Sequence, residues 1–251
     1  MYPYRPVQPG ISKQFHETVS YAEHLIIQPK LKDTMYCIWQ LKTSIPLALD
    51  FTYLVFPDCC VDIVIDINDT SDSVLVMTPV TSAVTLSLGR VFHYLGVRVF
   101  PGSWNNTWGV PALKIVSSVE PIPIQVPGLR KQLELYKDKP LHLYAKHLEN
   151  VIAQLDIQFQ PMPEYVMHLL QGIFVRTVAN SSRYSTRQLA RIVLEKTGFT
   201  PRELIRIGKM QRVLSDFNSN AYLQEYYDQP HFIREFKKIS GYTPSEYSKR
   251  F

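Results

Sequence analysis

A short stretch near the C-terminal end of the chain, residues 226–244, combines amide, basic and aromatic side chains in the sequence YYDQPHFIREFKKISGYTP. An aspartate before the basic residues is a candidate helix N-cap, and a glycine after them is a candidate helix stop. In such a helix, Gln229, His231 and Arg234 could donate hydrogen bonds to base edges, while backbone amides of the first turn approach a phosphate. The stretch therefore has the chemistry of a helix that reads duplex DNA.

The same turn chemistry occurs twice in this part of the chain. The segments TGFTPRELI at 197–205 and SGYTPSEYS at 240–248 share a small residue, Gly, an aromatic residue, Thr, Pro and Glu in the same order. Each glycine can end a helix in the left-handed conformation, and each Thr-Pro can begin the next helix. Between the two segments, Phe232, Ile233 and Phe236 are predicted to form an apolar stripe.

The basic charge of the chain is concentrated in the same region. The 251 residues carry a net charge of +5. From Ser181 onward there are 13 Lys and Arg against 7 Asp and Glu, whereas residues 1–180 hold the remaining 14 against 15. A basic segment joined to a near-neutral one is typical of nucleic-acid binding, although a solvated helical surface gives the same count.

The elements that must position these residues begin with a β-rich region. From about Thr34 to Pro101, runs rich in Val, Ile, Tyr and Phe alternate with Pro, Gly, Asp and Asn, which predicts short strands. Several such strands separated by turns favour a barrel or sandwich. Alternation in VDIVIDI places Asp62 and Asp66 on one wetted face. The predicted strands are 35–42, 51–57, 61–67, 73–80, 83–89 and 94–102.

From Gly128 onward the apolar spacing becomes helical. One helix is predicted to cover 141–155, and its apolar stripe could pack inside one subunit or form a dimer contact. Another is predicted over 163–178, with Pro163 and Glu164 in its first turn.

The C-terminal stretch resembles the second helix-turn-helix of AraC/XylS-type transcription regulators. That signature has an aromatic residue, a polar cap, Phe-x-x-x-Phe, a basic residue and then Gly-x-Ser/Thr-Pro-x-x-Tyr. Because many fixed positions over about 20 residues agree at once, the match is specific. Residues 198–214 likewise resemble the end of the first unit and the long helix that joins the two units. The matching positions are Tyr226 or Tyr227, Asp228, Phe232, Phe236, Lys237, Gly241, Thr243, Pro244 and Tyr247.

The N-terminal part resembles the cupin-like domain, of uncharacterised ligand, that a subgroup of these regulators carries. The resemblance rests on FPDCCVDIVIDIN, MTPVTSAVTLSLG and LGVRVFPG. The fold class expected is α+β, with an N-terminal cupin-like β-barrel or sandwich and an all-α C-terminal helix-turn-helix domain. The expected domains are a β sensor at 1–127, a helical linker or dimerisation region at 128–180 and an AraC-type helix-turn-helix domain at 181–251.

Two intervals are shorter than the family pattern requires. Between Leu189-Ala190 and Gly198 lie seven residues, too few for a turn of about 3 to 4 residues and a second helix. The first unit is therefore expected to be shortened, through missing segments, through degeneration of a paralogue or through fusion of two helices. The interval at 214–229 is also predicted to lack about one helical turn.

By this resemblance, the chain is expected to be a one-component bacterial transcription regulator that binds promoter DNA under the control of a small-molecule signal. The resemblance also allows RNA polymerase and a second copy of the chain as partners. The alternative is a ligand-binding or interaction protein that lost DNA binding through its shortened units. The predicted base-edge contacts are Gln229, His231 and Arg234. The predicted phosphate or orienting contacts are Lys237, Lys238, Arg202 and Arg206, with Arg187 and Arg191 as further candidates.

Aromatic residues of the N-terminal region are candidates for a ligand pocket, because a small β-barrel can hold one ligand. Trp39, Trp104 and Trp108 could line such a pocket. The loop PGSWNNTWGVP at 101–111 is predicted to close its mouth through Trp104 and Trp108. Core packing explains the same residues without a ligand.

Other chemistry is not favoured by the sequence. The seven histidines form no close cluster with a carboxylate, so no metal site, cofactor or enzyme activity is predicted. Cys59 and Cys60 could sense oxidation, but neighbouring acidic residues raise a thiol pKa, which favours buried structural cysteines. The sequence lacks an apolar run of about 18 residues and a basic leader with an apolar core, so the chain is predicted to be cytoplasmic, without membrane insertion.

Overall fold

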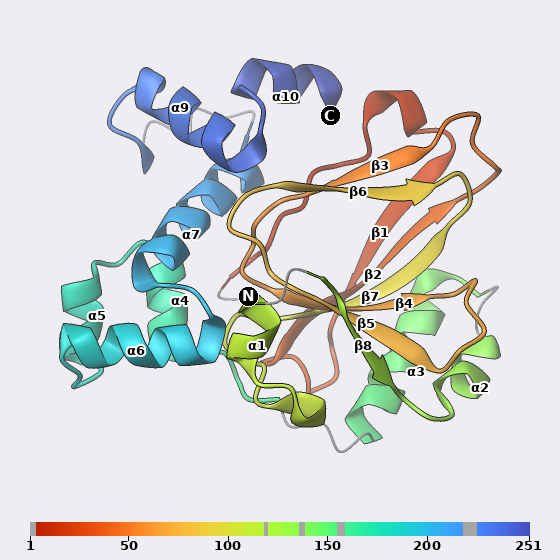
Figure 1. Ribbon diagram of the computed structural model, residues 1–251, viewed down its shortest axis with the longest axis horizontal. Helices are drawn as coiled ribbons and strands as arrows, with labels where there is room; N and C mark the ends of the chain where they lie inside the picture. Colours follow the sequence, from red (N-terminus) through yellow and green to blue (C-terminus); the bar gives the residue numbers. More distant parts are fainter. Residues whose placement is uncertain (1–3, 118–119, 136–138, 155–158, 218–224) are drawn as a thin grey trace.

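The computed structural model describes residues 4–117, 120–135, 139–154, 159–217 and 225–251 (Figure 1). Two antiparallel sheets form the N-terminal part and helices form the C-terminal part, which confirms the predicted α+β layout. The larger sheet consists, in spatial order, of β1 (Val19–Leu25), β2 (Met35–Thr43), β7 (His93–Val99), β4 (Val61–Asp66), β5 (Ser73–Met77) and β8 (Ile122–Gln125). The second sheet pairs β3 (Phe51–Val55) with β6 (Val84–Gly89).

The six predicted strands are all present, whereas the two edge strands of the larger sheet were not predicted. β1 exposes most of its side chains and so has no continuous apolar run. β8 contains Pro123, which cannot donate to a ladder and is tolerated at a sheet edge. Edge strands bury less apolar surface, and their sequences carry a correspondingly weaker signal.

Side-chain alternation gives the larger sheet two different faces. On one face, Ile63, Ile65, Leu95 and Val97 form a core with α3 (Leu141–Gln154), beside α2 (Leu129–Glu134). The α3 side chains in this core are Tyr144, Ala145, Leu148 and Ile152. The stripe predicted on 141–155 is therefore packed within one subunit; its last position, Leu155, lies outside the described residues.

The opposite face of the larger sheet is directed at the second sheet, so that β3 and β6 cover it (Figure 1). Asp62, Val64, Tyr94 and Arg98 lie on this face and line a cavity between the two sheets. The prediction of a solvent-wetted face at Asp62 is therefore wrong, because the covering sheet leaves its side chain only 17% exposed.

The helix predicted at 163–178 is in fact two helices. α4 (Glu164–Leu170) is followed by α5 (Val175–Ser181). Between them Gly172 has a φ of 87°, in the left-handed region that a continuous α-helix does not contain. The N-terminal part also has a short helix α1 (Ala112–Ser117) and two 3-10 turns, η1 (Lys13–Phe15) and η2 (Thr107–Gly109).

The expectation of a shortened first helix-turn-helix unit is wrong. α5 is followed by a turn at 182–185 and by α6 (Thr186–Thr197), which together form a helix, a turn and a second helix. Ser185 begins α6 through a capping box with Gln188, so the Gln-Leu-Ala run lies in the second helix of the unit rather than the first. The seven residues after it need hold only the rest of α6.

The remaining helices of the described residues are α7 (Pro201–Ser215), α9 (Gln229–Ser240) and α10 (Pro244–Arg250). Both Thr-Pro pairs begin a helix as predicted, because the side chains of Thr200 and Thr243 cap the N-termini of α7 and α10. Gly198 and Gly241 end the preceding helices at φ values of 74° and 80°. The interval predicted to be short, 214–229, includes 218–224, which lie outside the described residues.

The helices α4 and α7 cross in close contact at a glycine. Gly208 of α7 is buried, and a Cβ there would lie 2.0 Å from the backbone oxygen of Leu170 in α4. The guanidinium of Arg212, one turn further along α7, donates to the same Leu170 oxygen and pairs with Glu225. α4, upstream of position 181, is thus packed directly on the C-terminal helices.

Candidate nucleic-acid interface and ligand cavity

The predicted DNA-reading helix is present as α9. Asp228 caps it by accepting a hydrogen bond from the amide of His231 at 2.7 Å. Phe232, Phe236 and Ile239 face the core, whereas Ile233 is 37% exposed. The predicted apolar stripe is therefore wrong at Ile233, because the buried face of α9 consists of Phe232, Phe236 and Ile239.

The polar residues of α9 are not equally accessible. Gln229, Arg234, Lys237 and Lys238 are exposed. His231 is half-buried, because its ring packs edge-on against Tyr226 with the centroids 5.4 Å apart. Among the three predicted base-edge contacts, Gln229 and Arg234 are therefore better placed than His231.

The two predicted arginine contacts on α7 differ in their surroundings. Arg206 pairs with Glu235 of α9, with Nε 3.0 Å from Oε2. It therefore joins α7 to α9 and fits an orienting role better than a phosphate contact. Arg202 is exposed in the first turn of α7.

The second helix of the first unit, α6, presents a further polar surface. Leu189 and Val193 are buried, while Arg187, Gln188 and Arg191 are exposed. Arg191 lies 3.5 Å from Glu195 one turn later, an exposed pair that holds it only weakly. The signal that locates this helix in the sequence is the Ser-x-x-Gln capping box starting at Ser185.

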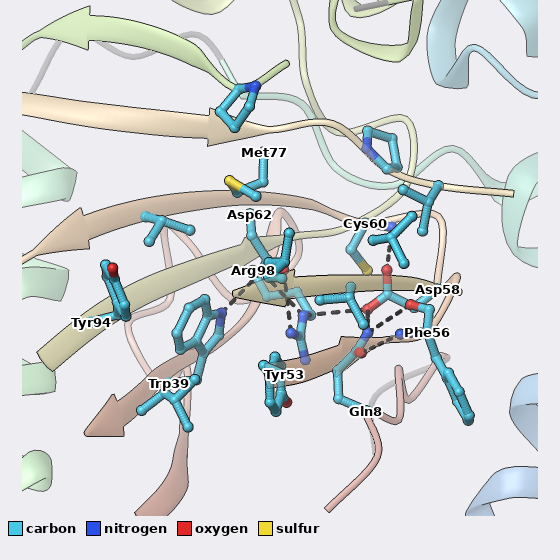
Figure 2. Close-up of a pocket in the computed structure, with 18 of the residues that line it drawn as sticks. Gln8, Trp39, Tyr53, Phe56, Asp58, Cys60, Asp62, Met77, Tyr94 and Arg98 are labelled. Carbon is cyan, nitrogen blue, oxygen red and sulfur yellow. Dashed lines mark hydrogen bonds and ion pairs between the residues drawn. The ribbon is translucent and has the colours of Figure 1, made fainter. Parts of the chain in front are cut away.

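A cavity of about 400 Å³ lies between the two sheets (Figure 2). Aromatic side chains from four strands, Tyr21, Trp39, Tyr53 and Tyr94, contribute to its lining. Trp39 pairs with Gly96 of the neighbouring strand, where a Cβ would stand 1.9 Å from the indole ring. The absence of a side chain at position 96 therefore leaves the space that the indole occupies.

A buried arginine forms the polar end of the cavity. Arg98 Nε lies 3.2 Å from Asp62 Oδ1 and 3.4 Å from Asp58 Oδ2, and Nη1 donates to Glu23 Oε1 at 3.3 Å. Asp62 also accepts a hydrogen bond from Trp39 Nε1 at 3.1 Å. Burial raises the pKa of the Asp58 carboxyl, and the Arg98 charge opposes that rise. The sequence offered one signal for this group, a lone arginine inside the apolar strand YLGVRVF.

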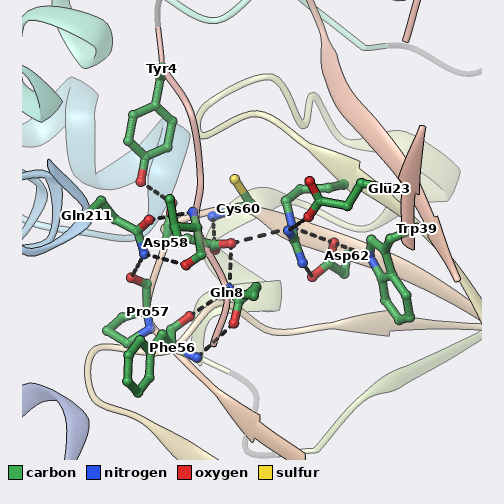
Figure 3. A network of polar contacts seen from close by, with 12 residues as sticks. Tyr4, Gln8, Glu23, Trp39, Phe56, Pro57, Asp58, Cys60, Asp62 and Gln211 are labelled. Carbon is green, nitrogen blue, oxygen red and sulfur yellow. Dashed lines mark hydrogen bonds and ion pairs between the residues drawn. The ribbon is translucent and has the colours of Figure 1, made fainter. Parts of the chain in front are cut away.

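The same network continues to the helices (Figure 3). Asp58 Oδ2 accepts from Gln8 Nε2 at 2.8 Å, and the backbone oxygen of Pro57 accepts from Gln211 Nε2 at 2.8 Å. Gln211 belongs to α7 and also exchanges two hydrogen bonds with the backbone of Val7. Segments 7–8 and 57–58 thus link the end of the cavity to the helix that joins the two helix-turn-helix units.

The tryptophans predicted to close the pocket do not line this cavity. Trp104 is buried in the core on the other face of the larger sheet, and its Nε1 donates to the Val110 oxygen at 2.6 Å. Trp108 contacts it edge-on, with ring centroids 5.9 Å apart. Of the three tryptophans, Trp39 is the one that lines the cavity. Trp104 is therefore a core residue, as the alternative without a ligand predicts.

The cysteines and other ionisable groups suggest no further site. Cys37, Cys59 and Cys60 are buried free thiols, and burial raises the pKa of each. Across the described ranges, no group of three or more His, Cys, Asp or Glu side chains could hold a metal ion. No helix within those ranges is long and apolar enough to cross a bilayer.

Two family models match the chain. Residues 178–250 match a helix-turn-helix domain, and residues 26–121 match a domain of unknown function, DUF6597. No curated protein and no solved structure matches it. The fold and these matches define a helix-turn-helix protein. More specifically, an AraC-type helix-turn-helix domain at the C-terminal end follows a DUF6597 domain, an order consistent with an AraC-type regulator.

The family matches bear on the remaining predictions. The helix-turn-helix match supports a DNA-binding transcription regulator, a class that is usually not enzymatic. The N-terminal match assigns no cupin character and no ligand to the β region.

Proposed function

We propose that the chain is a sequence-specific transcription regulator whose two helix-turn-helix units bind promoter DNA in the cytoplasm. The observation that carries this proposal is α9, which exposes Gln229, Arg234, Lys237 and Lys238 while its three buried apolar residues anchor it in the core. α6 supplies a second exposed basic helix through Arg187 and Arg191. The alternative is loss of DNA binding through shortened helix-turn-helix units; α5 and α6 argue against it for the first unit, whereas the short interval of the second unit includes 218–224, outside the described residues.

We further propose that the cavity between the sheets holds the small-molecule signal. Its volume lies within the range usual for ligand sites, and it combines aromatic walls with a few buried polar groups. In this proposal α2 and α3 belong to the sensor and α4 and α5 belong to the DNA-binding part. A homodimer and contact with RNA polymerase are further expectations of the resemblance.

The signal would reach the DNA-binding helices through Gln211. This side chain is 1% exposed and holds both Val7 and Pro57 against α7. A ligand that displaces Asp58 from Arg98 would move segment 57–58 and so change the position of α7. Because α7 joins the two units, a shift there changes the spacing of α6 and α9 on DNA.

Alanine substitutions on α9 test the DNA-binding proposal. Arg234→Ala is expected to cost about 1–3 kcal/mol of binding free energy and to relax base preference. Lys238→Ala is expected to weaken binding to all duplexes alike and to reduce the slope of log K against log salt by about 1. Fluorescence anisotropy on DNA from upstream of its own gene, with a random duplex as comparison and several salt concentrations, measures both effects.

The matched control for these variants is Lys131→Ala, which removes an exposed lysine from α2 on the sensor side. It should leave affinity and salt slope unchanged. If Arg234→Ala and Lys238→Ala behave like this control, α9 is not the helix that reads DNA.

Replacement of Gln211 tests the junction between sensor and helices. Gln211→Leu leaves the half-buried Val7 amide and the buried Pro57 carbonyl without their partner, so it should lower the free energy of unfolding by about 1–3 kcal/mol. Urea unfolding followed by circular dichroism measures the change. Gln132→Leu, at an exposed position of α2, serves as control and should unfold like the unaltered chain. Equal stability of the two variants would contradict a structural role for Gln211.

A further inference from the structure

We propose that the ligand of this cavity is an organic cation, an amine carried on an apolar or aromatic body, and that Asp62 is its anionic contact. This inference rests on the proposed sensing function and adds the chemical class of the signal. Three independent features of the cavity support it: its charge balance, its aromatic walls and an unpartnered hydroxyl.

The charge balance at the polar end of the cavity is negative. Asp58, Asp62 and Glu23 all lie within 3.4 Å of the Arg98 guanidinium. Arg98 is the one lysine or arginine among the described residues that line the cavity. Even with Asp58 protonated, Asp62 of the lining and Glu23 just outside it leave two carboxylates beside one guanidinium. An anionic ligand would have to approach these carboxylates, whereas a cation would restore neutrality.

Asp62 is the carboxylate best placed to meet such a ligand. Asp62 lines the cavity and has three hydrogen bonds, from Trp39 Nε1, Arg98 Nε and Arg98 Nη2. A carboxylate offers about four lone-pair positions, which leaves one for a ligand N–H. Asp58 also lines the cavity, but its side chain is less accessible, at 7% exposed against 17% for Asp62, and both its oxygens already accept, from Gln8 and from the Cys60 amide. Glu23 does not line the cavity itself.

The walls beside Asp62 are aromatic. The Tyr21 ring centroid lies 6.3 Å from that of Trp39 and 6.3 Å from that of Tyr53. Trp39, Tyr53 and Tyr94 all line the cavity (Figure 2). Ring faces attract cations through their quadrupoles, and they accept the apolar part of a ligand equally well. An acidic group beside aromatic rings, in a lining that is otherwise mostly aliphatic, is the combination that selects an organic amine over an inorganic cation.

The hydroxyl of Tyr53 also points to a missing partner. It is buried and has no hydrogen-bond partner within the part of the chain that the structure describes. Buried hydroxyl groups are normally hydrogen-bonded, so a ligand group that bonds to it would remove an energetic cost. Tyr53 and Asp62 line the same cavity from facing sheets and could hold opposite ends of one small molecule.

Three molecules of one shape test the proposed class: 4-phenylbutylamine, 4-phenylbutanol and 4-phenylbutyrate. Isothermal titration of the full chain, without DNA, should show the amine binding roughly tenfold tighter than the alcohol and the carboxylate binding weakest. Tighter binding of the carboxylate, equal binding of amine and alcohol, or no binding of the amine would each overturn the proposal.

Variants locate the contact. Asp62→Asn should remove the preference for amine over alcohol, and Tyr94→Leu should reduce it. Asp50→Asn is the control, because it removes one negative charge from an exposed pair with Arg90 outside the cavity lining. Its amine preference should equal that of the unaltered chain. Tyr94→Leu leaves the Arg98 ion pairs intact, so this variant still tests whether the amine binds in the cavity if Asp62→Asn fails to fold. If both variants keep the full preference, the cation binds elsewhere.

DNA binding measured in parallel separates this inference from the proposed function. If the amine binds in the cavity but promoter affinity does not change, the ligand class stands and the sensing role fails. If the carboxylate or the alcohol binds tightest and changes promoter affinity, the sensing role stands and the proposed class fails.

Discussion

Gly208→Ala is expected to destabilise the chain by about 3 kcal/mol or more, although alanine is the better helix former. In an exposed helix this change would stabilise by up to about 1 kcal/mol, because glycine loses more backbone entropy. Here the new Cβ would lie 2.0 Å from the Leu170 backbone oxygen. A backbone atom cannot rotate away like a side chain, so α4 and α7 must separate and lose packing along their contact.

Urea unfolding of the full chain measures this effect, with promoter binding as a second readout. Gly10→Ala is the matched control, because a Cβ there meets nothing within 4 Å. The control should change stability by less than about 0.5 kcal/mol. An unchanged or increased unfolding free energy for Gly208→Ala would show that α4 does not cross α7 at this distance.

Arg98→Met is expected to lower the free energy of unfolding by about 3–5 kcal/mol, because it leaves the carboxylates of Asp58, Asp62 and Glu23 without their shared cation. Arg90→Met is the matched control. It breaks an ion pair with Asp50 whose two side chains are 60% and 65% exposed, and such exposed pairs contribute at most about 1 kcal/mol. The double variant Arg98→Met/Asp62→Asn should recover part of the loss, since one unpaired carboxylate is removed.

The destabilisation by Arg98→Met should also depend on pH with a definite sign. Burial already raises the pKa of Asp58 above its ordinary value, and loss of the guanidinium removes the charge that opposes this rise. A carboxyl whose pKa is raised in the folded state binds more protons there than in the unfolded state. The cost of the substitution should therefore be smallest at acidic pH and grow as the pH rises through the folded-state pKa. A cost that is constant from pH 4 to pH 8 would contradict the ion-pair assignment.

The sequence predicted the second helix-turn-helix unit because its information is local. Asp228, Gly241, Thr243 and Pro244 act on backbone within one turn of themselves, and the structure confirms each as a cap, a stop or a start. Phe232 and Phe236 are four residues apart on one helix face, so their burial follows from periodicity alone. The same local rule, applied to Ser185 and Gln188, would have placed α6 correctly.

Ile233 and Gly172 show where local rules end. Ile233 is apolar and adjacent to the stripe, but the core contacted by α9 does not extend to it. Gly172 lies in a helical pattern, yet its left-handed φ separates α4 from α5. In both cases, the packing of other elements against the segment decided between conformations that the sequence left open.

The sequence by itself determined that this chain pairs a β-rich region with a basic helical region, and which residues begin and end most of the C-terminal helices. Those features depend on composition, period and capping, which act over a few residues. Only the tertiary structure decided which side chains line the cavity, because Trp39, Asp62 and Arg98 come from different strands and Asp58 from the loop before β4. It likewise decided that Gln211 meets Pro57, since contacts across 154 positions depend on how sheets and helices pack.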